Sequence, residues 1–391
     1  MQFDDWLSDT WRERLSDLCD SIAAGAAESE RSGRLAATSV AALAAAGVTN
    51  LYLPRTLGGE EVDPVTCALV TEAIARCDSA AAWFVMVANS PRLLAASWPQ
   101  ALVERLWRSD PHTIVAASGH TMLQGEACGD QIVVDGTVRF ASGAHHAQWI
   151  AAPCLIAGAT EADEARRVMA IVPAERCEIL DDWDSVGMRG TGSNSVRVPR
   201  VAIPAGMTAP IAAELRAAND HYSGPLYRCP GRVLFATYVP ISLATAARAL
   251  EVLSQLAANK TPAAADALLR ERAAAQMKYG RALAVYRSAR EYFLAALHEA
   301  WERALRGESA TAQQRADLYL AGTHGVQAAA ETVRLVADAA GTSAVDERAP
   351  LARLVRDMET LRQHGFASEN RYASVAQQLW GAQLDYPLLL R

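Results

Sequence analysis

The strongest constraint in this chain is a change of sequence texture that occurs twice. Residues 1 to about 110 have a helical pattern and contain alanine-rich stretches such as 36–46 and 80–88, and alanine is the best helix former. Residues 111–205 show short alternating apolar and polar runs that glycines and prolines interrupt. From about residue 230 long helical patterns return. The order predicts an α+β fold, mostly α, with a β region between two helical regions.

We therefore predict three domains. Residues 1–110 form an N-terminal α-helical domain, 111–215 a central β-barrel or sandwich domain, and 216–391 a C-terminal four-helix bundle that also carries oligomerisation. Short connections between long helices predict an up-down bundle. Its four helices are expected near residues 232–258, 263–305, 309–339 and 349–380.

Local signals refine this outline. Asp63-Pro64 is a typical helix start, with Asp as the N-cap and Pro at the first position. Asp135-Gly136 is a hairpin-type dipeptide inside an alternating run. Strands are expected at residues 131–140, 149–157, 167–172, 178–180 and 195–201.

Composition excludes several classes of protein. Among 391 residues, 51% are hydrophobic and the formal net charge is −7, which excludes a disordered chain and argues against nucleic-acid binding. The N-terminus lacks the pattern of a targeting signal, and no apolar run reaches the length of a membrane span. We expect a cytoplasmic protein that binds neither membrane nor nucleic acid. Seven cysteines without a C-x-x-C motif predict reduced, mostly buried thiols rather than disulfides or a zinc site.

Four segments, spread over nearly the whole chain, form a pattern of their own. They are Leu53–Gly59 with Glu72–Ser79 and Trp83, then Phe140–Gly143 with Trp149, then Trp183–Ser193 leading to Ile203-Pro204, and finally Gly341–Ala344 with Pro350–Arg353 and Arg356-Asp357. In their order and spacing, these segments together resemble the acyl-CoA dehydrogenase superfamily. The resemblance implies an N-terminal helical domain, a central β domain and a four-helix bundle.

Two chemistries occur in this superfamily. Many dehydrogenases place a catalytic Glu about nine residues after the Arg of the Arg-Asp pair, and here that position is Gly365. A glycine cannot act as a base. The chain is more similar to the oxygenase components of two-component flavin monooxygenases, which commonly have a His near this position. His364 matches that placement.

This resemblance implies an oxidoreductase that uses reduced FMN or FAD and O2, through a C4a-hydroperoxyflavin, to hydroxylate an aromatic or polycyclic small molecule. A separate NAD(P)H:flavin reductase would supply the reduced flavin. The link at residues 258–262 lacks the Arg-x-x-Phe-Gly motif that holds the adenosine half of FAD in dehydrogenases, so FMN and FAD both stay open. The family also implies a homotetramer or homodimer.

Two residues are the candidates for catalysis. An imidazole titrates near neutral pH, so His364 is a candidate base toward a phenol, an indole N–H or an amine. Ser142 stands before Gly143, which allows the backbone to approach a flavin ring closely, and its hydroxyl is predicted to bond the flavin N5 or peroxide region.

Further residues are assigned to binding. The cofactor-binding candidates are Phe140, Ser142, Gly143, Trp183, Arg189, Thr191, Ser193, Gly341 and Arg353. The substrate-binding candidates are Asn89, His120, His145 and His146. No metal is expected, since adjacent strand residues such as His145 and His146 point to opposite faces.

Other interpretations stay open. An acyl-CoA dehydrogenase-like flavoenzyme with a relocated base, an amino-group N-oxygenase and a non-catalytic scaffold each fit part of the pattern. The sequence identifies neither the substrate nor the choice between oxidation of carbon, nitrogen or sulfur.

Overall fold

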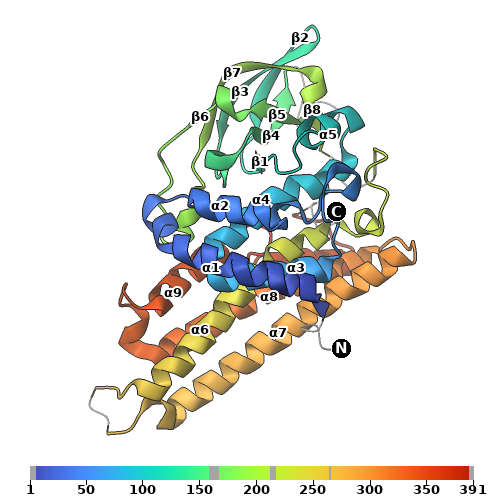
Figure 1. Ribbon diagram of the computed structural model, residues 1–391. Coiled ribbons are helices and arrows are strands. Elements are labelled where there is room, and N and C mark those ends of the chain that lie inside the picture. The colour runs from blue at the N-terminus through green and yellow to red at the C-terminus, as the bar shows by residue number, and fades with distance from the viewer. Residues whose placement is uncertain (1–5, 158–166, 212–216, 264–265, 387–391) are drawn as a thin grey trace.

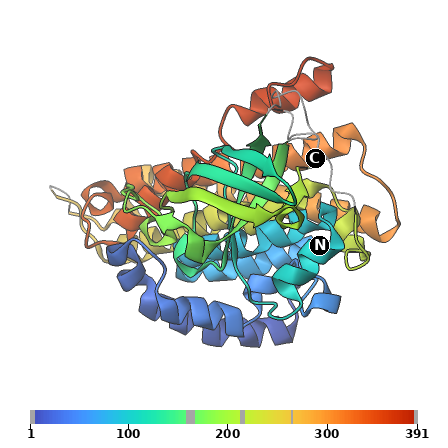
Figure 2. The ribbon, with the colours of Figure 1, turned by 90° about the horizontal axis from the view of Figure 1, so that it is seen from above.

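The computed structural model describes residues 6–157, 167–211, 217–263 and 266–386. A sheet lies at one end of the molecule, helices of the N-terminal region lie beneath it, and long bundle helices cross below these (Figure 1). Seen from above, the sheet lies over the middle of the molecule, and the blue helices near the N-terminus extend beside it (Figure 2). The described part of the chain therefore follows the predicted order of helices, sheet and helices.

The N-terminal helices pack around α3, which is buried along nearly its whole length. Asp63 caps α3 as the sequence predicts, since its carboxylate accepts hydrogen bonds from the amides of Val65 and Thr66, both at 2.9 Å. The helices of this region are α1 (Asp9–Ser32), α2 (Ala37–Ala45), α3 (Pro64–Cys77), α4 (Ser79–Leu94) and α5 (Gln100–Trp107).

The β region is one mixed sheet with the strand order β6-β7-β3-β2-β4-β5-β8, and β1 also pairs with β4. Strands β1 and β2 run parallel to β4, and the other pairs are antiparallel. The strands are β1 (Val115–Ala117), β2 (Leu123–Cys128), β3 (Gln131–Val138), β4 (Trp149–Ile156), β5 (Arg167–Pro173), β6 (Glu178–Ile179), β7 (Val196–Pro204) and β8 (Thr208–Pro210).

The hairpin prediction was wrong in position. Strands β2 and β3 turn at Gly129-Asp130, where Gly129 has a φ of 64°. Asp135-Gly136 lies inside β3, where the pairing with β7 shifts register between Val134 and Gly136. The glycine therefore marks a bulge, which is the other common use of glycine inside a strand.

The C-terminal region begins with three long helices, but the predicted fourth helix is broken. The sequence predicts one helix near 349–380, whereas the structure has two shorter helices separated by a turn at 362–370. The second helix also begins later than expected, at Ala273. The helices are α6 (Val239–Asn259), α7 (Ala273–Leu305), α8 (Ala312–Ala340), α9 (Pro350–Leu361) and α10 (Arg371–Trp380).

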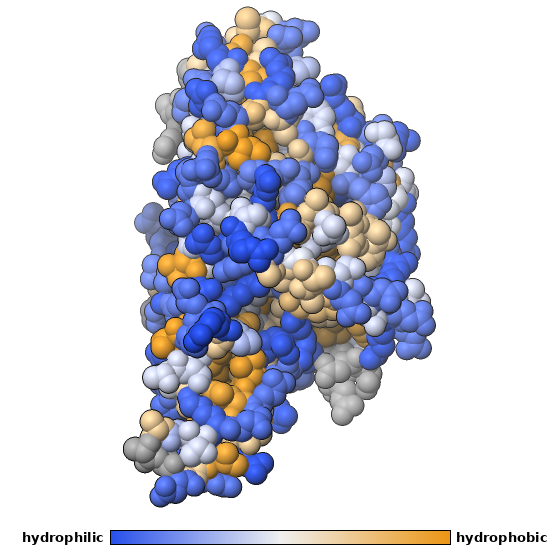
Figure 3. Space-filling view, turned by 60° about the vertical axis from the view of Figure 1, so that its left-hand side comes forward, coloured by the Kyte–Doolittle hydropathy of each residue, from blue (hydrophilic) through white to orange (hydrophobic). Residues whose placement is uncertain are grey.

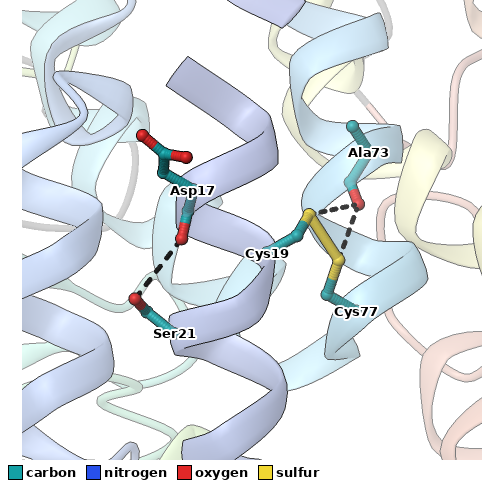
Figure 4. The surroundings of a disulfide bond; sticks show 5 residues. All are labelled: Asp17, Cys19, Ser21, Ala73 and Cys77. Carbon is teal, nitrogen blue, oxygen red and sulfur yellow. Dashed lines mark hydrogen bonds between the residues drawn. A yellow bond between two sulfur atoms is a disulfide. The ribbon is translucent and has the colours of Figure 1, made fainter. Parts of the chain in front are cut away.

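The prediction of seven reduced thiols was also wrong. Cys19 of α1 and Cys77 at the end of α3 form a disulfide, with their Cα atoms 5.7 Å apart (Figure 4). Both sulfurs lie near the Ala73 carbonyl oxygen, at 3.7 and 3.4 Å. A spacing of 58 residues gives no local signal, because only the packing of α1 against α3 brings the two side chains together.

Among the residues that the structure describes, one helical segment is long and apolar enough to cross a membrane. It covers Gly231–Asn259, and 94% of its most apolar window is buried inside the protein. It is therefore the core helix of the bundle.

Candidate functional site

Three buried hydroxyl groups meet between the loop that follows β3 and the loop that precedes β7. The Ser142 and Ser193 oxygens are 2.6 Å apart, and those of Ser193 and Thr191 are 2.7 Å apart. Thr191 also donates a hydrogen bond to the Met188 carbonyl oxygen, at 2.8 Å. The three side chains are 6–7% exposed. We call Ser142, Ser193 and Thr191 the hydroxyl chain.

Backbone hydrogen bonds fix the two loops that carry the hydroxyl chain. The Gly143 amide donates to the Thr191 carbonyl over 3.1 Å, and the Ala141 amide donates to the Asn194 carbonyl over 3.1 Å. Gly143 has a φ of 74°, and a Cβ there would lie 3.2 Å from the ring of Phe84. Glycine therefore permits this loop to pack closely on α4, which is a different use from the predicted approach to a flavin ring, and the nearest strand ends earlier than expected, at Val138.

The loop that bears Thr191 and Ser193 is docked on α9. The Met188 amide donates to the Asp357 carboxylate over 2.6 Å, and Met188 has a φ of 55°, a left-handed conformation that is uncommon outside glycine. A Cβ at Gly187 would overlap the carbonyl oxygen of Arg356. Burial raises the pKa of Asp357 to about 6, while the Arg353 guanidinium acts in the opposite direction.

Arg353 belongs to an ionic cluster beside this docking point. Its guanidinium donates to the Asp78 carboxylate over 2.7 Å and lies 3.5 Å from Glu30. Arg356 lies 3.3 Å from the same Glu30 carboxylate. Arg353 and Asp78 also line a cavity of about 250 Å³. The predicted contact of Arg353 with a flavin phosphate would compete with these carboxylates.

His364 lies in the turn between α9 and α10, not on the expected helix. Its ring is surrounded by three aromatic rings, those of Trp83, Tyr238 and Phe366, at centroid distances of 5.3, 5.1 and 4.7 Å. The Phe366 amide donates to its Nδ1 over 3.4 Å, which is a long hydrogen bond. Burial lowers the pKa of His364 to about 4, so the imidazole is neutral at pH 7.

Side chains from α8 and the start of α6 hold the backbone of this turn. Tyr238 donates to the Leu361 carbonyl over 2.9 Å, and Tyr319 donates to the Phe366 carbonyl over 2.6 Å. Gln327 donates to the Ala367 carbonyl over 2.8 Å. The sequence analysis missed these residues, because a lone Tyr or Gln in a buried helix gives no signal for a contact about 40 to 120 residues away.

Helix α4 packs both against the loops that carry the hydroxyl chain and against His364. Its Phe84 and Val87 side chains lie against Gly143, and its Ala80 Cβ lies 3.1 Å from a Cβ built at Gly190. Trp83 lies within one turn of these residues and contacts His364. The structure thus brings the hydroxyl chain and His364 to adjacent faces of one helix.

An aromatic group flanks the hydroxyl chain at the sheet edge. Phe140 is 45% exposed with a φ of 55°, and its ring contacts His120 at 4.9 Å and Trp183 at 6.4 Å between centroids. Trp183 Nε1 donates to the Arg189 carbonyl over 2.9 Å. Arg189 donates to the Ser185 carbonyl over 3.0 Å. The predicted residues Phe140, Trp183 and His120 therefore cluster.

The paired histidines lie in the 3-10 turn Ala144–His146 rather than on a strand. His145 Nε2 lies 3.0 Å from the Asn194 side-chain oxygen, and His146 Nε2 lies 3.0 Å from the Leu35 carbonyl. Burial lowers the pKa of His146. The two rings therefore bond different partners, and the strand geometry from which the sequence analysis argued about a metal ion is not present at these residues.

Two predicted binding residues lie in other settings. Asn89 is fully buried, and its amide group bonds the backbone of Tyr52, Val48 and Val85. Gly341 is exposed at the end of α8. Within the described ranges, no group of three or more His, Cys, Asp or Glu side chains is placed to hold a metal ion.

The chemistry of these groups fits a flavin ring. The ring is flat and largely apolar with polar edges, and the described site offers neutral hydroxyls and an exposed aromatic face. Trp83 Nε1 is buried and lacks a hydrogen-bond partner among the described residues. A buried donor without an acceptor is costly, so a ligand that supplies one is favoured there.

Comparison with known proteins agrees with the fold described above. Family models for the N-terminal and C-terminal domains of acyl-CoA dehydrogenase match residues 8–96 and 236–369, together more than half of the chain. Indole-3-acetate monooxygenase from Pseudomonas putida is 27% identical over 91% of this chain and 90% of its own length. The flavin-dependent monooxygenase oxygenase subunit HsaA from Mycobacterium tuberculosis is 27% identical over 58% of this chain and 57% of its own.

A solved structure shows the same fold. XiaF from a Streptomyces species, in complex with FADH2 and glycerol, superposes with a TM-score of 0.89 at 20% identity, over 96% of both chains. The predicted fold class and the predicted resemblance are therefore confirmed. The chain belongs to the acyl-CoA dehydrogenase superfamily.

Proposed function

We propose that this protein is the oxygenase component of a two-component monooxygenase that hydroxylates an aromatic or polycyclic small molecule. The observation that supports this most is the aromatic enclosure of His364 next to Gly365. A neutral imidazole occupies the region where a dehydrogenase of this fold needs a carboxylate base.

Reduced FMN or FAD is the proposed cofactor and O2 the co-substrate. The bound dihydroflavin supplies the activation of dioxygen. On the protein side, we assign Ser142 to the flavin N5 edge, Gly143 to close backbone approach, and Phe140 with Trp183 to the ring face. Relatives with flavin in their names, such as the HsaA subunit, support the cofactor class.

His364 is the proposed acid–base group. Its neutral ring can take up a proton from a phenol or an indole N–H, because the long contact between Nδ1 and the Phe366 amide costs little to exchange. Trp83, Tyr238 and Phe366 cover three sides of this half-buried ring. Exclusion of water from the reacting centre favours hydroxylation over loss of peroxide.

The proposed partners follow from the same reading. A separate NAD(P)H:flavin reductase delivers the reduced flavin, as expected for the oxygenase part of a two-component system. We propose a homotetramer or homodimer in the cytoplasm. Large apolar side chains stay exposed on the helical region, such as Met277, Leu379 and Trp380 at 83%. On one face of the molecule, apolar residues form patches among polar ones (Figure 3).

A rapid-mixing experiment tests the proposal. The protein with reduced FMN or FADH2 is mixed with oxygenated buffer, and absorbance is followed with and without indole as a model aromatic. A transient that differs from both reduced and oxidised flavin, formed in wild type and short-lived in Ser142→Ala, is expected. Oxidised FAD bound tightly and bleached by an acyl-CoA would instead identify a dehydrogenase. A His364→Ala variant with full hydroxylation and normal coupling would remove the acid–base assignment.

A further inference from the structure

The hydrogens of the hydroxyl chain have a single consistent arrangement. The Met188 carbonyl only accepts, so Thr191 uses its one hydrogen in the 2.8 Å bond to that oxygen. In the 2.7 Å contact between Thr191 and Ser193, Ser193 is therefore the donor. The hydrogen of Ser193 is then used, so Ser142 is the donor in the 2.6 Å contact between Ser142 and Ser193.

This arrangement decides what Ser142 can offer a ligand. Its only hydrogen is directed to Ser193, so its Oγ presents lone pairs alone. N5 of a dihydroflavin carries a hydrogen, whereas N5 of an oxidised flavin is itself an acceptor. We propose that the hydroxyl chain polarises Ser142 as an acceptor and so makes the site select reduced over oxidised flavin, an inference that rests on the proposed contact of Ser142 with N5.

The polarity is fixed by the fold rather than by a ligand. The Met188 carbonyl, which accepts the first hydrogen bond of the hydroxyl chain, is held in place because the Met188 amide donates to Asp357 over 2.6 Å. The Gly143 amide donates to the Thr191 carbonyl over 3.1 Å, which locks the Ser142 loop to the Thr191 loop. All three hydroxyl side chains are buried, so water competes poorly for their hydrogens.

Selection of this kind suits an enzyme that receives its flavin already reduced. Reduced flavin must bind in the presence of oxidised flavin, and oxidised flavin must leave after each turnover. Two facing acceptors, Ser142 Oγ and the N5 of oxidised flavin, disfavour the oxidised form without any steric change. Ser193 and Thr191 are thus positioning residues, which act on the flavin through Ser142.

Anaerobic binding titrations test the inference. Dissociation constants of reduced and oxidised FMN, and of reduced and oxidised FAD, are measured by ultrafiltration for wild type and variants. In Ser193→Ala the hydrogen of Ser142 is released and can serve the N5 of oxidised flavin. The ratio of oxidised to reduced dissociation constants is expected to fall about three- to tenfold, the value of one hydrogen bond, mainly through tighter binding of oxidised flavin.

Further variants separate polarity from simple loss of a contact. Thr191→Val frees the hydrogen of Ser193 and should lower the ratio in the same direction, whereas Thr191→Ser keeps the chain and should restore the wild-type ratio. Ser142→Ala removes the acceptor itself, so it should lower the ratio mainly by weaker binding of reduced flavin, whereas Ser193→Ala lowers it mainly by tighter binding of oxidised flavin. Thr332→Val removes a buried hydroxyl of α8 that bonds only within the bundle, and serves as the matched control.

The outcomes are distinguishable. A wild type that prefers reduced flavin, with the same ratio in folded Ser193→Ala and Thr191→Val variants, overturns the polarity and leaves the proposed function intact. A wild type that binds neither reduced nor oxidised flavin overturns the proposed function itself. A lowered ratio in both variants, rescued by Thr191→Ser, supports the inference.

Discussion

Replacement of His364 by phenylalanine should remove a specific part of the acid sensitivity of the fold. Burial lowers the pKa of His364 from 6.5 to about 4. The unfolded chain therefore binds this proton more tightly, and the free energy of unfolding falls as pH drops from 6.5 toward 4. A shift of this size corresponds to at most about 3 kcal/mol, of which about 2 kcal/mol is lost between pH 7 and pH 5.

Urea denaturation at pH 7 and pH 5 measures how much unfolding free energy the protein loses between these two pH values. A phenylalanine at position 364 keeps an aromatic ring between Trp83 and Tyr238 but does not titrate. The difference in unfolding free energy between the two pH values should be smaller by about 2 kcal/mol in His364→Phe than in wild type. Trp380→Phe, at an exposed position and without a titrating side chain, is the control and should retain the wild-type difference. If His364→Phe and wild type lose stability equally at pH 5, the ring is not buried as described and the reasoning fails.

Three further predictions concern the framework of the site. Gly187→Ala places a Cβ on the backbone of α9 and should destabilise the protein by about 3 kcal/mol or more in thermal melts. A wild-type melting temperature would contradict the packing of the Met188 loop on α9. Tyr319→Phe loses the hydrogen bond to the Phe366 carbonyl and should lower the unfolding free energy by about 1 to 2 kcal/mol in urea titrations. Flavin oxidation should also be less well coupled to hydroxylation. Unchanged stability and coupling would show that the turn is held without this bond. Reduction of the Cys19–Cys77 disulfide, which closes a loop of 58 residues, should lower the unfolding free energy by up to about 4 kcal/mol, and the Cys19→Ala variant should show no response to reductant.

The order of helices and strands could be predicted because each type of element has its own periodicity. The alternating run at β3 and the Asp63-Pro64 cap of α3 are local patterns, and both appear as predicted. The break near Gly365 could not be predicted in this way. Tertiary hydrogen bonds from Tyr319 and Gln327 satisfy carbonyls that a continuous helix would have used itself.

The site was predictable as a set of residue types but not as a geometry. A Ser before Gly143 and a Gly-rich segment around Thr191 are visible in the sequence, whereas their union into one hydrogen-bonded chain depends on loops about fifty residues apart. Asp357 belongs to the Arg356-Asp357 pair, but the sequence assigns no role to its carboxylate. Its function as the acceptor for the Met188 amide is visible only once α9 packs on that loop.

The break between α9 and α10 decides the surroundings of His364. If the helix continued past Leu361, His364 would stand on a helical surface and its backbone would be bonded within the helix. The turn instead moves the imidazole among Trp83, Tyr238 and Phe366, where burial keeps it neutral. A carboxylate enclosed in the same way would resist ionisation, since burial disfavours the charged form. An enclosure of rings around a neutral group is therefore suited to protecting a reactive oxygen species from water, and poorly suited to holding the charged carboxylate that a dehydrogenase uses as its base.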